Sequence, residues 1–88
     1  MADSEVATLL AQSRAAHAEY QQHKARFDPR LGAATPGNPV LKRTALAKAA
    51  LLRTQAHTID PKHEDPAWQL DTVPHIELLN FYVSELAK

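Results

Sequence analysis

Metal-ligating side chains gather in the second half of this 88-residue chain. His57, Asp60, His63 and Glu64 lie within eight residues, and His75 follows. Imidazole and carboxylate groups bind zinc and other first-row transition metals. No two of these histidines are four residues apart, however, and the chain has no HExxH or ExxH motif. We therefore predict no metal ion and no cofactor, and leave open whether His57, Asp60 and His63 ever bind a metal.

The same stretch, DPKHEDPAW at residues 60–68, also has a purely structural interpretation. Asp-Pro occurs three times in the chain, beginning at Asp28, Asp60 and Asp65. An aspartate in such a pair can accept a hydrogen bond from a backbone N–H two or three residues further on, and the proline fixes φ for the first turn. We favour this interpretation, in which residues 60–68 form two successive capped turns.

The sequence does not favour an enzyme. Nucleophilic catalysis needs a base within hydrogen-bond reach and an oxyanion site. Ser4, Ser13 and Ser84 have no glycine-rich elbow beside them, and Gly32 and Gly37 stand alone, so no loop is suited to cradle a phosphate. Cysteine is absent, which excludes disulfides, zinc–thiolate sites and thiol catalysis. We therefore predict a non-enzymatic protein.

Two aromatic residues with a polar edge are expected at helix junctions. His17 lies on an apolar stripe one turn before Tyr20, so we interpret it as a packed residue hydrogen-bonded to another helix. A pH-sensitive contact is the alternative, because histidine titrates near neutrality. Trp68, the only tryptophan, either plugs the end of the helices or anchors an interface, where tryptophan is enriched.

Composition and periodicity predict an all-α protein. Alanine is abundant and only two glycines occur, as is typical of helices. Apolar residues recur at alternating spacings of three and four. Asp28-Pro29 is expected to end the first helix, and Asn38 to cap the second. The prediction is a single domain over residues 1–88, with helices at about 4–27, 39–59 and 73–87, short helical turns at 60–68, and a Pro/Gly loop at 28–38.

The helices carry more apolar surface than three packed helices need. The second and third expected helices are apolar around much of their circumference, and exposed apolar patches usually mark interfaces. We therefore predict a homo-oligomer or a larger assembly. The predicted contact residues are Val40, Leu41, Leu51, Leu52, Trp68, Phe81 and Tyr82.

Charge is distributed unevenly although the formal net charge is zero. Residues 14–53 hold eight basic and two acidic side chains, a net charge of +6, while residues 54–88 hold two basic and six acidic ones, a net charge of −4. The two parts can neutralise each other within one subunit or between copies. The third possibility is nucleic-acid binding, which phosphate contacts dominate. The residues predicted for that alternative are Arg14, Lys24, Arg26, Lys42 and Arg43.

The chain has no run of about 18 apolar residues, the length that would predict a membrane span. The lack of cysteine favours a reducing compartment, so we expect a cytoplasmic protein. Small, cysteine-free, alanine-rich helical chains of this kind resemble accessory proteins of bacteria and their phages, including head and connector components. That resemblance implies a structural or interaction protein. The alternative, which depends on the basic segment 14–53, is a small nucleic-acid-binding or regulatory protein.

Overall fold

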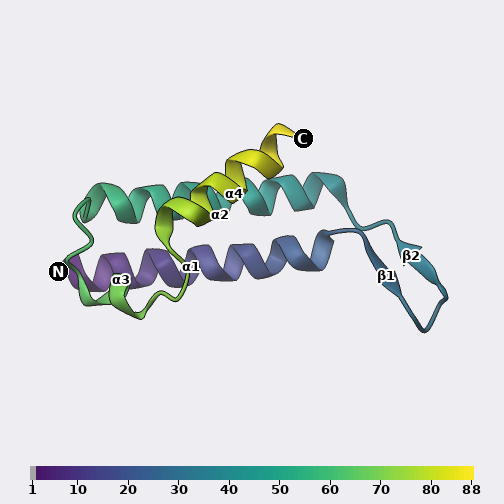
Figure 1. The fold of residues 1–88 in the computed structure, drawn as a ribbon, viewed down its shortest axis with the longest axis horizontal. Coiled ribbons are helices and arrows are strands. Elements are labelled where there is room, and N and C mark those ends of the chain that lie inside the picture. Colours follow the sequence, from purple (N-terminus) through teal and green to yellow (C-terminus); the bar gives the residue numbers. More distant parts are fainter. Residues whose placement is uncertain (1) are drawn as a thin grey trace.

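A computed structural model describes residues 2–88 and shows a mostly helical chain (Figure 1). This confirms the prediction of a small all-α domain, apart from one short sheet. Within the described residues the elements follow in the order α1 (Ala2–His23), β1 (Arg26–Asp28), β2 (Ala33–Thr35), α2 (Pro39–Ile59), α3 (Pro66–Leu70) and α4 (His75–Ala87).

The later helices lie close to their predicted positions. α2 has the predicted bounds because the Leu41 N–H donates to Asn38 Oδ1 at 3.1 Å and Pro39 occupies the first turn. α3 lies at the end of the stretch predicted to form helical turns, and α4 begins two residues later than predicted. None of the helices in residues 2–88 combines the length and the apolar character needed to cross a membrane.

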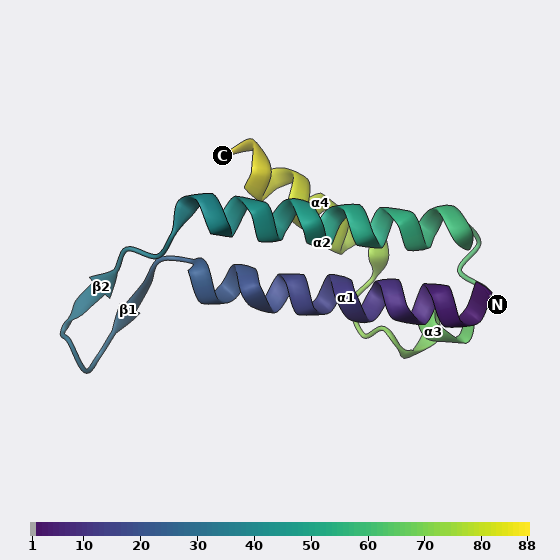
Figure 2. The same ribbon diagram turned by 180° about the vertical axis from the view of Figure 1, so that it is seen from behind.

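Two long antiparallel helices, α1 and α2, form the body of the molecule (Figures 1 and 2). α4 packs on α2, and the short α3 packs on α1. The antiparallel strands β1 and β2 form a hairpin that projects from the end of the helical pair (Figure 1). The molecule is therefore elongated, with extents of 48 × 25 × 18 Å.

The core consists of two hydrophobic clusters along the α1–α2 seam. Alanines of α2 lie in both clusters and allow the two helices to approach closely. Between the clusters, the buried Ser13 hydroxyl donates to the Ala49 carbonyl at 2.8 Å, which ties α1 to α2. One cluster contains Ala16, Tyr20, Ala45, Leu46, Ala49 and Tyr82, and the other contains Val6, Leu10, Ala56 and Trp68.

The end of the first helix was predicted wrongly. α1 ends at His23, not near Phe27, and much of the predicted 28–38 loop forms the hairpin instead. The His23 carbonyl accepts the Asn38 N–H at 2.8 Å, so the start of α2 is fixed at the end of α1. Gly37 makes this possible, because its φ is 70° and a Cβ there would collide with the backbone of residues 23–25.

The hairpin turn follows from Asp28. Its carbonyl accepts the N–H groups of Leu31 and Gly32 at 3.2 and 3.0 Å, and its Oδ1 accepts the Arg30 N–H at 2.9 Å. Gly32 supplies the positive φ, 64°, that such a turn requires. The Asp-Pro pair at residue 28 thus starts a turn, as predicted, but inside a hairpin and not at a helix end.

Candidate functional site

Three histidines meet where the end of α2, the loop after it and the start of α4 come together. His57 Nδ1 lies 2.9 Å from His63 Nε2. The rings of His57 and His75 are stacked, with centroids 4.7 Å apart and planes 14° from parallel. One nitrogen from each of the three side chains lies within 4.8 Å of the other two. We call His57, His63 and His75 the histidine cluster.

His75 is the buried member of the cluster. It is 5% exposed, and neither ring nitrogen has a hydrogen-bond partner in the part of the chain that the structure describes. The Trp68 indole covers the cluster, with ring centroids 4.1 Å from His63 and 5.0 Å from His75. Burial, reinforced by His57 and Arg53, lowers the pKa of His75 from 6.5 to about 4. His75 is therefore a neutral imidazole at neutral pH.

Two aspartates fold the loop that carries His63. Asp60 accepts the backbone N–H groups of Glu64 at 3.1 Å and of Asp65 at 2.6 Å, and Asp65 accepts the Ala67 N–H at 2.8 Å. His63 takes a φ of 55°, a left-handed conformation that is uncommon for histidine. The aspartates start turns as predicted, although Asp60 reaches four and five residues ahead, further than the two or three expected.

Sequence spacing predicted this constellation only in part. It grouped His57, Asp60, His63 and Glu64, with His75 further on, but the Asp60 carboxylate is engaged by backbone N–H groups, and His75 joins the other two histidines instead. The three histidines are separated by six and twelve residues along the chain, so the helical i, i+4 rule could not detect them. The available signal was the pair of aspartate turns, which fold residues 60–65 back toward the end of α2.

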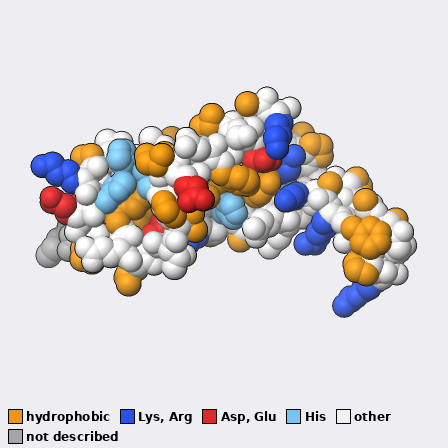
Figure 3. Space-filling model, in the orientation of Figure 1, with side chains coloured by type: hydrophobic (Ala, Val, Ile, Leu, Met, Phe, Trp, Pro, Cys, Tyr) orange, Lys and Arg blue, Asp and Glu red, His pale blue; other side chains and the backbone are white. Residues whose placement is uncertain are grey.

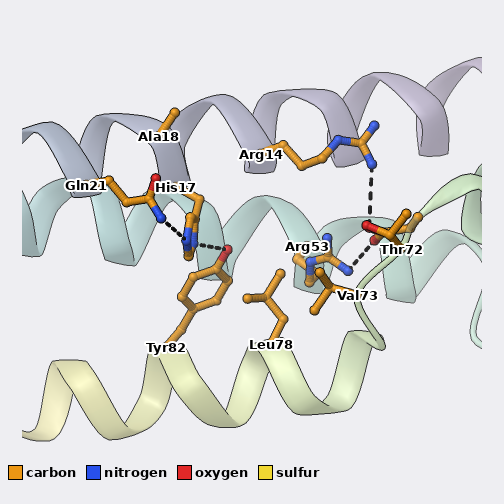
Figure 4. A pocket seen from close by; sticks show the side chains of 10 residues that line it. Arg14, His17, Ala18, Gln21, Arg53, Thr72, Val73, Leu78 and Tyr82 are labelled. Atoms are coloured by element: carbon orange, nitrogen blue, oxygen red, sulfur yellow. Dashed lines mark hydrogen bonds and ion pairs between the residues drawn. The ribbon is translucent and has the colours of Figure 1, made fainter.

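A second polar cluster surrounds a cavity of about 230 Å³ between α1, α2, α4 and the chain before α4 (Figure 4). Arg53 is fully buried, and its Nη1 lies 2.6 Å from Asp71 Oδ2. This contact is an ion pair without the alignment of a hydrogen bond, and Arg53 Nε and Nη2 have no partner among the described residues. Arg14 Nη1 approaches the other Asp71 oxygen at 3.5 Å.

His17 lies on the same cavity (Figure 4). Its Nδ1 is 3.1 Å from the Tyr82 hydroxyl, and its Nε2 is 3.4 Å from Gln21 Nε2. Burial, followed by the charge of Arg53, lowers the pKa of His17 below 6.5. His17 is therefore a packed residue hydrogen-bonded to another helix, as predicted, and its partner there is the Tyr82 hydroxyl.

The residues predicted to contact a partner divide into two groups. Val40 and Leu51 are 72% and 58% exposed, Leu41 and Phe81 are less so, and Leu52 is half-buried. Trp68 and Tyr82 instead belong to the two core clusters, because α3 and α4 turn these rings toward α1 and α2. Those two side chains are used within their own chain and are not on its surface.

The residues predicted to bind nucleic acid fall into two groups by position. Arg14 forms an ion pair with Asp71. Lys24 and Arg26 lie at the base of the hairpin, and Lys42 and Arg43 lie in the first turns of α2. Basic side chains consequently gather near the junction of the hairpin and the helices (Figure 3).

No protein-family model, curated protein or solved structure matches this chain significantly. The fold defines it as a small, predominantly helical domain.

Proposed function

We propose that this protein is a non-enzymatic interaction protein that works as a homo-oligomer, with the solvent-facing side of α2 as the contact between copies. The observation that carries the proposal is an uncharged stripe along the exposed side of α2. Its members recur at spacings of 4, 3, 4, 3 and 4, as at the a and d positions of a coiled coil. They are Val40, Thr44, Ala47, Leu51, Thr54 and Thr58.

The threonines do not make this stripe polar. The hydroxyls of Thr44, Thr54 and Thr58 each donate to the carbonyl four residues earlier, at 2.9, 2.8 and 3.0 Å. These donors are satisfied within the helix, so the stripe can be buried without leaving a hydroxyl proton unpaired. Apart from Leu51, its side chains are no larger than valine, and small side chains let two helices approach closely.

The exposed area of the molecule also supports a partner. Its accessible surface is 5955 Å², whereas a compact monomer of this mass has about 5,100 Å². Its radius of gyration is 14.8 Å, against about 12 Å for a compact chain of this length. Burying apolar surface in a contact stabilises it by about 25 cal/mol per Å².

Charge favours an antiparallel pair of copies. In a parallel pair, Arg43 of one copy would lie beside Lys48 of the other, at flanking positions. In an antiparallel pair centred on Ala49, the basic start of α2 lies beside the last turn of the other copy's α2, which carries no lysine or arginine and is followed by Asp60. Lys48 is then the main cation near the twofold axis, and its long side chain can extend into solvent.

Light scattering across a concentration series tests the proposal. We expect the wild type to approach the mass of a dimer and Leu51→Glu to remain a monomer, since a charge at the centre of the stripe opposes burial. Gln22→Glu places the same carboxylate on an exposed position of α1 and should dimerise like the wild type. A wild type that stays monomeric at the highest attainable concentration would overturn the proposal.

The hairpin keeps a second candidate function in view. Phe27 and Leu31 are 65% and 73% exposed on it, beside the exposed Arg26 and Arg30. Two-stranded ribbons can enter the major groove of DNA. A nucleic-acid-binding protein should bind DNA or RNA with an affinity that falls steeply as the salt concentration rises, and binding that does not respond to salt would exclude this function.

For either function we propose the cytoplasm as the compartment, because the chain has no cysteine.

A further inference from the structure

The geometry points to a transition-metal site in the histidine cluster: His57, His63 and His75 bind one divalent ion of the zinc type through three imidazole nitrogens. This site is separate from the contact proposed on α2 and does not depend on it.

The donor nitrogens are already near the spacing that a metal requires. Zinc binds imidazole nitrogen at about 2.0–2.1 Å in a tetrahedral arrangement, so two ligating nitrogens lie about 3.3 Å apart. The nitrogens of His57 and His63 are 2.9 Å apart, and all three donors lie within 4.8 Å of one another. For His75 to bind the same ion, its ring must rotate out of the stack with His57, because the two ring planes are 14° from parallel and imidazole binds a metal in its ring plane.

The polar groups of His75 point to a ligand independently of this spacing. Its ring is 5% exposed, and both its nitrogens lack a hydrogen-bond partner among the described residues. Buried polar side chains in native proteins nearly always have a partner. A metal ion bound to one ring nitrogen would supply it, and the rings of His57 and His63 lie against His75 from two other segments.

The donor set selects the class of ion. Imidazole suits zinc, copper, nickel and iron, whereas calcium and magnesium require oxygen ligands. Two nearby carboxylates are engaged elsewhere, Asp60 by backbone N–H groups and Asp71 by Arg53. The three proposed ligands are all imidazole nitrogens, which excludes calcium and magnesium as the ions of this site.

The surroundings leave room for a fourth ligand. A cavity of about 320 Å³ lies against His63 and His75 and is lined also by Trp68 and Gln69. Water or a small anion can approach the ion from this side, which gives the three-histidine, one-open-position arrangement known for zinc. The ion would also link three segments of the chain: the end of α2, the loop that carries His63, and the start of α4.

Titration with Zn²⁺ after treatment with a chelator tests the site. We expect one equivalent to bind, the midpoint of thermal unfolding to rise, and Co²⁺ to give the visible absorption of a tetrahedral nitrogen site. His63→Asn should lower the affinity at least tenfold while the fold is kept, because asparagine tolerates the left-handed backbone found at residue 63. His23→Gln, a histidine far from the cluster, is the matched control and should bind like the wild type.

Circular dichroism of each variant separates lost binding from lost folding. His75→Gln is a second variant that removes a proposed ligand. If it does not fold, His63→Asn alone decides whether the cluster binds the metal. The proposal is overturned if the wild type binds no stoichiometric Zn²⁺, or if His63→Asn binds as tightly as the wild type. Repeating the titration with Leu51→Glu shows whether binding survives in a monomer, as the proposal requires, so failure of the α2 contact and failure of the metal site are distinguishable.

Discussion

At the scale of single residues, the least expected feature is a buried ion pair. Arg53 lies on the helix face that also presents Ala45, Leu46 and Ala49 to the core, and it is fully buried. A charge in such a position is tolerated only when it is paired, and Asp71 supplies the pairing from the chain before α4. Sequence patterning did not reveal this pair, because an arginine and an aspartate eighteen residues apart show no helical relation.

Asp71→Asn should destabilise the protein strongly. It leaves the Arg53 guanidinium buried and uncompensated, a change that typically costs about 3–5 kcal/mol. Urea unfolding followed by circular dichroism measures the loss. Glu85→Gln is the control, since the Glu85–Lys88 pair lies at the surface, where solvent screens the two charges and the pair contributes little to stability. Equal effects of the two substitutions would show that Arg53 does not depend on Asp71.

His17 gives the fold a pH dependence with a definite sign. Burial and Arg53 hold its pKa below 6.5 in the folded chain, so the unfolded chain binds the proton first as the pH falls. The His17 contribution to the unfolding free energy is therefore present above pH 6.5 and is lost as the pH falls through the folded pKa. Titration of the imidazole by NMR should give a pKa below 6.5; a value at or above 6.5 would contradict this account.

At the scale of elements, local signals predicted α2 well and the end of α1 poorly. Asn38 and Pro39 define the start of α2 through contacts within a few residues, which a sequence pattern can show. The end of α1 depends on pairing between Phe27 and Ala34 and on a backbone contact with Asn38. Tyr20, Lys24 and Phe27 fit a helical period, so periodicity extended the helix beyond the point where these non-local contacts end it.

The two glycines allow a matched test of this junction. Gly37→Ala should destabilise the protein by about 1–2 kcal/mol or more, because it adds backbone collisions at residues 23–25 to the strain of a positive φ. Gly32→Ala has a similar φ but no atom within 4 Å of the added Cβ, so it should cost less. Thermal unfolding of both variants measures the difference. If Gly32→Ala were the more damaging, the close packing of Gly37 on α1 would not be what sets the junction.

The histidine cluster also belongs to this scale. Its members come from α2, the following loop and α4, and they meet only because Asp60 and Asp65 turn the chain twice. The aspartate turns were predictable from the Asp-Pro pairs. The meeting point was not, because it depends on how far each turn rotates the chain and on α4 packing against α2.

At the scale of the whole molecule, the structure is an elongated helical pair with an uneven distribution of charge. An uncharged stripe runs along one side of it. The stripe of α2 is symmetric about Ala49, so an antiparallel partner would place Val40 opposite Thr58, Thr44 opposite Thr54, and Ala47 opposite Leu51. The pattern thus specifies a register as well as a surface.

Cysteine crosslinking reads this register directly, because the chain has no cysteine of its own. Two single variants, Val40→Cys and Thr58→Cys, are mixed and oxidised at a concentration where the wild type is dimeric. The antiparallel arrangement predicts a disulfide-linked heterodimer from the mixture and little linkage within either variant alone, since a disulfide needs Cα atoms about 5.5–6 Å apart. Equal linkage of Val40→Cys with itself, or no linkage in the mixture, would contradict the proposed contact on α2.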